Sequence, residues 1–108
     1  MTETDFLARA SATLAAIEAA LDASGADIEV NSTGNVVTLE LANDSRVVIN
    51  TQTPTRQIWV AAKSGGFHFG WNEQSGAWLD TRGGDELFAS LSRIISAQGG
   101  AAVLLRAP

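Results

Sequence analysis

Four carboxylates lie close together in the chain between residues 18 and 29. Glu18 and Asp22 are four residues apart, which places them on one face of a helix, and Asp27 and Glu29 are two apart, which places them on one face of a strand. Clustered, hydrated carboxylate oxygens are the ligands that hard cations prefer. The four acids therefore predict a site for a cation or for a basic protein. The same pattern is also typical of a solvated face whose charges prevent aggregation at a sheet edge.

A second group of residues has the spacing of strands and the chemistry of a protein-binding surface. Asn50 and Gln52 alternate with inward-facing aliphatic residues, and so do Gln57 and Trp59, while His68 lies between two phenylalanines. Large aromatic side chains on an exposed face often anchor partners. We therefore expect these five side chains on the open face of a sheet, with His68 as a surface hydrogen-bonding group rather than a general base. The alternative is that Trp59 only covers a neighbouring strand.

The composition excludes several kinds of chemistry. The chain of 108 residues has no cysteine and one histidine, so disulfides, thiolate metal sites and a cysteine nucleophile are excluded. It contains no nucleophile motif, phosphate-binding loop or dinucleotide fingerprint. We therefore predict no catalytic residue.

The acidic charge of the chain is unevenly distributed. The formal net charge is -5, but residues 1–44 contain eight acids and one base, whereas residues 45–108 contain four acids and six bases. Clustered Lys and Arg engage nucleic acids and anionic membranes, so we expect neither as a partner. No apolar run approaches the ~20 residues that span a bilayer, and the acidic N-terminus differs from basic targeting peptides. The expected location is the cytoplasm.

The spacing of apolar residues predicts the elements that must position these groups. A stripe from Phe6 to Leu21 predicts a first helix, which Ser24 and Gly25 end. A second stripe predicts a helix over Asp85–Ala97. Between them the apolar period changes to two, which predicts six short strands. Their expected ranges are Asp27–Asn31, Asn35–Leu41, Arg46–Gln52, Gln57–Ala61, Gly66–Trp71 and Ala77–Asp80.

The order of these elements predicts an α+β fold with two layers. An antiparallel meander of about six strands carries the N- and C-terminal helices on one face, and its other face is left to solvent. We expect a single domain over residues 1–108, because this length supports one core. Trp71 and Trp78 are expected in that core. The tail from Ala102 to Arg106 is apolar enough to pack as a short strand or a strap.

The run from Val48 to Trp59 resembles the bacterial branch of the frataxin family. The pattern is Asn-x-Gln-x-Pro-x-x-Gln-Ile-Trp, followed by the Gly-Gly-Phe-His-Phe run that starts at Gly65 and by Trp78 before the second helix. The likeness extends over essentially the whole chain. It implies the frataxin sandwich, in which two helices pack on one face of an antiparallel sheet.

The resemblance also implies a role in iron–sulfur cluster assembly. In the family, an acidic ridge formed by the first helix and first strand binds iron weakly, as Fe(II) or Fe(III). The ridge and the outer sheet surface contact a cysteine desulfurase and its scaffold protein. The ridge corresponds here to Glu18, Asp22, Asp27 and Glu29, and the sheet surface to Asn50, Gln52, Gln57 and Trp59.

The implied protein is an iron-responsive regulator or iron donor of the desulfurase complex, monomeric without metal. Two alternatives stay open: a ferroxidase that oxidises Fe(II) at the ridge, and an interaction module that needs no metal. One departure from the family concerns the ridge, where small residues such as Ala19 and Ala23 lie among the acids. Fewer carboxylates predict weaker iron binding and a lower stoichiometry, whereas the motif on the sheet is complete.

Overall fold

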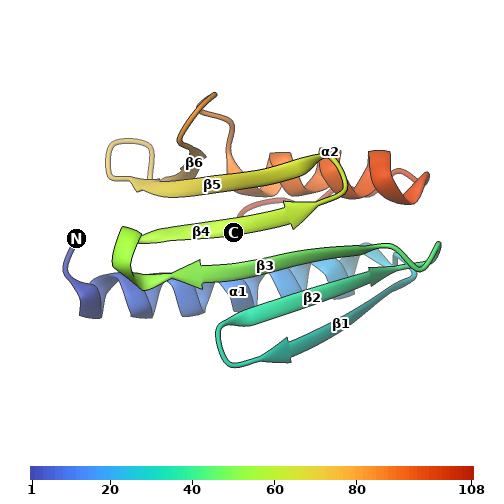
Figure 1. Ribbon diagram of the computed structural model, residues 1–108, viewed down its shortest axis with the longest axis horizontal. Coiled ribbons are helices and arrows are strands. Elements are labelled where there is room, and N and C mark those ends of the chain that lie inside the picture. The colour runs from blue at the N-terminus through green and yellow to red at the C-terminus, as the bar shows by residue number, and fades with distance from the viewer.

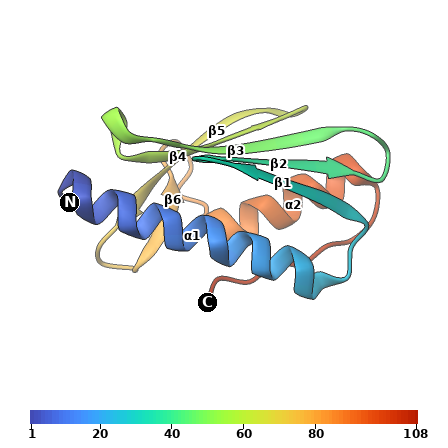
Figure 2. The same ribbon diagram turned by 90° about the horizontal axis from the view of Figure 1, so that it is seen from below.

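The computed structural model describes residues 1–108 and contains two helices and one sheet. The helices are α1 (Glu3–Ser24) and α2 (Leu87–Gly99), and the strands are β1 (Ile28–Thr33), β2 (Val36–Leu41), β3 (Arg46–Gln52), β4 (Gln57–Ala62), β5 (Gly65–Asn72) and β6 (Ala77–Asp80). The strands pair in chain order, each antiparallel to the next, from β1 at one edge to β6 at the other (Figure 1). Both helices cover the same face (Figure 2). The predicted two-layer α+β sandwich is confirmed.

The first helix is capped at its start by Thr2 and ends at the predicted residues. The Thr2 hydroxyl accepts a hydrogen bond from the Asp5 N–H at 3.1 Å, which caps the first turn. Gly25 follows the helix with a φ of 69°, a left-handed conformation that glycine adopts at little cost. The buried side of α1 is the predicted stripe of Phe6, Ala10, Leu14, Ile17 and Leu21.

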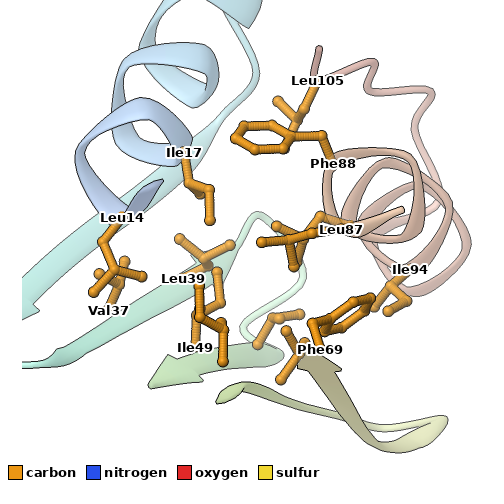
Figure 3. Packing of buried hydrophobic residues seen from close by; sticks show 14 of the residues in the cluster. Leu14, Ile17, Val37, Leu39, Ile49, Phe69, Leu87, Phe88, Ile94 and Leu105 are labelled. Atoms are coloured by element: carbon orange, nitrogen blue, oxygen red, sulfur yellow. The ribbon is translucent and has the colours of Figure 1, made fainter. Parts of the chain in front are cut away.

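The inner face of the sheet supplies the other half of the core. Along β2, β3 and β4, buried residues alternate with partly exposed ones, so Leu39, Ile49 and Val60 all face the helices. Figure 3 shows side chains of α1, the sheet and α2 meeting between the two layers. The alternating residues on the other face remain open to solvent, because no helix covers that side (Figure 2).

The first strand differs from its predicted range. β1 covers Ile28–Thr33 rather than Asp27–Asn31, because its ladder with β2 continues to the pair formed by Thr33 and Val36. The hairpin turn then lies at Gly34, whose φ of 58° is the positive value that a tight hairpin requires.

The second helix is shifted by two residues from its predicted range of Asp85–Ala97. Its N-cap is Glu86, whose carboxylate accepts hydrogen bonds from the N–H groups of Phe88 at 2.7 Å and Ala89 at 3.0 Å. The cap therefore fixes the start of α2 at Leu87. Neither α1 nor α2 is both long and apolar enough to cross a bilayer.

The tail after α2 forms a strap, which is one of its two predicted forms. The Ser92 hydroxyl accepts a hydrogen bond from the Leu105 N–H at 2.8 Å, and the Ser96 hydroxyl accepts one from the Val103 N–H at 2.9 Å. These bonds hold the side chain of Leu105 in the core, where it is 3% exposed (Figure 3).

Two tryptophans expected in the core are buried to different degrees. Trp78 is 3% exposed and packs edge-on against Phe6, with ring centroids 6.0 Å apart. Trp71 is only partly buried and packs against the margin of the core. The prediction is therefore confirmed for Trp78 and only partly correct for Trp71.

Candidate functional site

The open face of the sheet carries a straight row of three functional side chains. Asn50 of β3 pairs with Trp59 of β4, and Trp59 pairs with His68 of β5. Residues paired across strands lie on the same face, so the three side chains form one row over the central strands. The structure thus brings together residues that are far apart in the sequence, as the alternation of strand residues predicts.

The side chains in this row hold one another in place. The rings of Trp59 and His68 are stacked, with centroids 4.2 Å apart and planes 9° apart. The Trp59 Nε1–H donates a hydrogen bond to Gln57 Oε1 at 2.7 Å. Gln52 Nε2 donates to Asn50 Oδ1 at 3.3 Å. We call these five residues the sheet-face group: Asn50, Gln52, Gln57, Trp59 and His68.

Trp59 was predicted either to be an exposed anchor for a partner or only to cover a neighbouring strand, and each prediction describes part of its position. Its ring lies over the neighbouring strand β5 through His68, yet it remains partly exposed, and His68 itself is exposed. An aromatic pair that is fixed before binding presents apolar area with little loss of side-chain entropy. The sheet-face group is therefore suited to contact a flat protein surface.

The link between β3 and β4 sets the register of the sheet-face group. The 3-10 turn η1 (Thr53–Thr55) contains Pro54, and Arg56 follows with a φ of 54°. The Arg56 guanidinium donates a hydrogen bond to the Thr53 carbonyl oxygen, within the same turn. This short, internally bonded link makes Gln52 pair with Gln57 at the ends of the two strands.

The four predicted ridge acids lie along α1 and the edge strand β1. β1 pairs with β2 alone, so this strand forms one edge of the sheet. Asp22, Asp27 and Glu29 are exposed, and Glu18 is partly buried. None of the four forms an ion pair, because the only ion pair in the structure joins Arg93 to Asp85 at 3.3 Å. All four carboxylates are therefore available to a cation or a basic partner.

The ridge acids do not converge on one point. Glu18 lines a groove of about 270 Å³ together with Ser32 and Asn35, at the end of β1 opposite to Asp27. The five residue-to-residue steps from Asp27 to Ser32 span roughly 16 Å at about 3.3 Å per step. No group of three or more His, Cys, Asp or Glu side chains is placed to hold a metal ion together. The ridge is therefore a line of separate carboxylates rather than a chelating cage.

Sequence reasoning missed one acid that belongs to the same surface. Glu40 of β2 pairs directly with Glu29 of β1, and Arg46 of β3 pairs with Glu40. Like charges in direct cross-strand contact are destabilising. Strand alternation could have placed Glu40 on the outer face. Its pairing with Glu29 depends on the hairpin turn at Gly34, and the predicted first strand ends two residues before β1 does.

The chain is similar to known proteins over almost its whole length. A family model described as a frataxin-like domain matches residues 1–101. The iron-sulfur cluster assembly protein CyaY of Cupriavidus metallidurans is 49% identical over 110 residues, which cover 98% of this chain and 97% of that protein. The protein of the same name from Paraburkholderia xenovorans is 51% identical over 100 residues and 93% of each chain.

Solved structures give the same family likeness. A frataxin of the CyaY family from Psychromonas ingrahamii has a TM-score of 0.90 and 34% identity, covering 99% of this chain and 100% of that one. The trimeric frataxin of Saccharomyces cerevisiae, solved in complex with ferrous iron, has a TM-score of 0.65 and 28% identity, covering 93% of this chain and 88% of that one.

Proposed function

This chain belongs to the frataxin-like family, and we propose that it acts in iron–sulfur cluster assembly as an iron-binding protein that docks on the assembly machinery. The proposed partners are a cysteine desulfurase and its scaffold protein, and the proposed location is the cytoplasm. The observation that carries the proposal is the sheet-face group, in which Trp59 and His68 are stacked beside three carboxamides on an otherwise open sheet.

The sheet-face group supplies the anchor for docking. Tryptophan is enriched among residues that dominate binding energy, especially where a pocket of the partner removes it from water. The carboxamides around Trp59 can donate and accept hydrogen bonds at the rim of such a contact, as protein interfaces commonly do. Because Gln57 already orients the indole through a 2.7 Å hydrogen bond, little ordering is needed on binding.

The ridge acids supply the iron-binding part of the proposal. Carboxylate oxygens suit hard cations such as Fe(III), and no competing ion pair neutralises these four. Because the acids are spread along β1 and α1, each bound ion would keep most of its water ligands. We therefore propose weak and exchangeable iron binding, which suits a sensor or a donor better than a store.

The ridge also suits electrostatic contact with a basic patch on the desulfurase. Iron and the partner would then use the same carboxylates, so iron occupancy would compete with docking or change its strength. This competition would make the protein an iron-responsive regulator of sulfur transfer. Exposed charges are screened by salt, so both interactions should weaken as ionic strength rises.

An anaerobic NMR titration with Fe(II), repeated with purified desulfurase, tests the proposal. Fe(II) should broaden signals of residues 18–29 first, and the desulfurase should shift the signals of Trp59 and Gln57. Broadening centred elsewhere would refute the ridge as the iron site. Unchanged Trp59 and Gln57 signals at saturating desulfurase would refute docking through the sheet face.

We propose no catalytic step for this protein. A ferroxidase must bind and oxidise Fe(II) at defined ligands, whereas the ridge acids are separated along the edge of the sheet. Stopped-flow mixing of the protein with Fe(II) in aerated buffer measures the oxidation directly. We expect the rate of buffer alone, and a saturable rate above it that is lost in Glu18→Gln with Asp22→Asn would establish the ferroxidase instead.

A further inference from the structure

The two edges of the sheet differ in whether another segment covers their backbone. At the β6 edge, Leu79 forms an isolated bridge with Glu86, and the Asp80 N–H donates a hydrogen bond to the Asp85 carbonyl oxygen at 2.8 Å. At the other edge, β1 pairs with β2 alone and is the outermost strand (Figure 1). β1 is regular over six residue pairs and contains no proline or lysine, which often keep edge strands from pairing. Its backbone is therefore open to another strand.

The hydrogen bonds at the start of β1 determine which of its backbone groups point away from the sheet. Ile28 pairs with Leu41, yet the N–H groups of both donate elsewhere, to carbonyl oxygens of nearby loop residues. This pair is therefore not hydrogen-bonded, and hydrogen-bonded and non-hydrogen-bonded pairs alternate along an antiparallel ladder. Val30 and Ser32 consequently direct both their N–H and their C=O groups away from β2, toward the open edge.

The side of this edge that faces α1 is incompletely filled. Val37 and Leu39 of β2 are fully buried. Their partners on β1 are Ser32, which is exposed, and Val30, which is only partly buried. Ser32 borders the groove of about 270 Å³ between α1 and the β1–β2 hairpin, which is also lined by Leu7, a side chain that is 47% exposed. A strand beside β1 would cover Val30 and place an apolar side chain at the mouth of this groove.

The outer side of the edge selects the charge of such a strand. Arg46 of β3, Glu40 of β2 and Glu29 of β1 are paired in one row across the sheet. Glu29 thus has a like charge on one side and no neighbour on the other, and Asp27 precedes it by two residues. Opposite charges directly across strands are stabilising, and like charges are destabilising. A lysine or arginine beside Glu29 would complete the row, whereas β1 of a second copy has no basic residue to offer.

From these observations we propose that the β1 edge binds an extended, basic segment of a partner protein as an added antiparallel strand. The added strand exchanges backbone hydrogen bonds with Val30 and Ser32. Main-chain bonds of this kind provide affinity, and the alternating side chains provide specificity. Apolar residues of the segment lie opposite Ser32 and Val30 on the helix side, and basic residues lie beside Glu29 and Asp27 on the outer side. The expected pattern is apolar-x-apolar-basic-x-basic.

A synthetic peptide tests the proposal without iron and without the desulfurase, so its failure would leave the proposed function intact. The peptide acetyl-Thr-Leu-Thr-Val-Lys-Val-Lys-amide has the expected pattern. Its matched control, acetyl-Thr-Leu-Val-Lys-Lys-Val-Thr-amide, has the same composition, but its adjacent lysines cannot both lie on one side of a strand. In the ¹⁵N-labelled protein, the first peptide should shift the amide signals of Val30 and Ser32 saturably, slow their hydrogen exchange and leave the Trp59 indole signal unmoved. Equal affinity of the two peptides would show charge attraction alone and would overturn the proposal.

N-methylated peptides distinguish strand addition from contact through side chains. Methylation of the leucine N–H, which donates to the Ser32 carbonyl oxygen, should weaken binding at least roughly tenfold. Methylation of the third-position threonine, whose N–H points away from β1, should change the affinity by less than about twofold. Similar losses from the two methylations would contradict an added strand.

A charge exchange locates the added strand on the protein. Asp27→Lys with Glu29→Lys should weaken binding of the lysine peptide at least roughly tenfold and should favour the peptide in which both lysines are replaced by glutamate. The variant should fold, because it removes the repulsion between Glu29 and Glu40. Glu3→Lys with Glu73→Lys makes an equal charge change away from β1 and should stay within about threefold of the parent affinity. Retained binding in the first variant, or equal losses in both, would overturn the site.

Sedimentation of the protein alone tests the other occupant of the edge. The acids on and around β1 repel a second copy, so we expect a monomer in which the Val30 and Ser32 amides exchange quickly. A dimer whose formation slows the exchange of these two amides would assign the edge to a second copy instead.

Discussion

Trp59 shows how one side chain can be both fixed by its own protein and available to another. Its indole is stacked on His68 and hydrogen-bonded to Gln57, yet part of the ring faces solvent. The stabilising contacts are local to the open face and do not reach the core between the layers. Removal of the indole should therefore affect binding far more than folding.

We predict that Trp59→Ala weakens binding to the desulfurase by about 2 kcal/mol or more, roughly 30-fold in Kd. The free energy of unfolding should fall by only about 1 kcal/mol, because the loss is mainly that of a half-exposed aromatic pair. Isothermal titration calorimetry and urea denaturation measure the two effects. Thr38→Ala, on the same face in β2, is the control and should change neither. Parent-like affinity of Trp59→Ala would remove the anchor from the proposal.

The stack itself could not be predicted from the sequence, although the direction of each side chain could. Alternation places Trp59 and His68 on the outer face whatever the pairing of their strands. The predicted turn at Ser64 and Gly65 would pair Trp59 with Gly70, whereas the observed turn, with Ala62 opposite Gly65, pairs it with His68. A shift of the turn by one residue thus decides whether the indole has an aromatic neighbour.

At the scale of elements, the strap after α2 has no regular secondary structure, yet it packs against the core through Leu105. Leu105 is 3% exposed while its neighbour Leu104 is 64% exposed, which offers a matched pair of leucines. We predict that Leu105→Ala lowers the free energy of unfolding by about 2–4 kcal/mol, because a buried side chain leaves a cavity. Leu104→Ala should change it by less than about 0.5 kcal/mol. Urea denaturation distinguishes them, and equal effects would show that the strap is not packed in solution.

The start of α2 depends on a single glutamate. Glu86 accepts hydrogen bonds from the N–H groups of Phe88 and Ala89, which would otherwise lack partners. We predict that Glu86→Ala lowers the free energy of unfolding by about 1 kcal/mol, whereas Glu86→Asp, which keeps a capping carboxylate, loses less than half of that. Thermal unfolding followed by circular dichroism measures both. Indistinguishable midpoints for these two variants would mean that the cap contributes nothing.

The elements themselves were largely predictable because their signals are local. Apolar spacing, Thr2 and Gly25 define α1, and alternation defines the strands, so both layers follow from short stretches of sequence. The strap and the spread of the ridge acids are not local. They depend on where Leu105 meets Ser92 and on how far β1 carries its residues from the end of α1, which only the packed structure fixes.

At the scale of the whole molecule, the acidic residues that are concentrated early in the sequence are also concentrated in one part of the fold. Six of the eight acids in residues 1–44 lie between Glu18 and Asp44, in the C-terminal half of α1, around β1 and along β2, so the excess negative charge gathers at the β1 edge of the sheet. The row of Asn50, Trp59 and His68 begins on β3, the strand next to β2. A field of this kind steers a basic partner toward that edge and raises the association rate. The ridge acids can therefore assist docking even where they touch no partner residue.

Charge reversal on the ridge tests this long-range role. We predict that Glu18→Lys with Asp22→Lys weakens desulfurase binding at least roughly tenfold at low salt, mainly through slower association, and that the difference shrinks as salt screens the charges. The free energy of unfolding should stay unchanged or rise slightly, because both sites lie in the C-terminal half of α1, where the helix dipole favours cations.

A control variant, Glu3→Lys with Glu73→Lys, changes the net charge equally but away from β1, so its association rate should stay closer to that of the parent. Surface plasmon resonance at several salt concentrations gives the rates. If both double variants slowed association equally, net charge alone would steer the partner, and a large loss of stability in the first would show that Glu18 and Asp22 serve the fold instead.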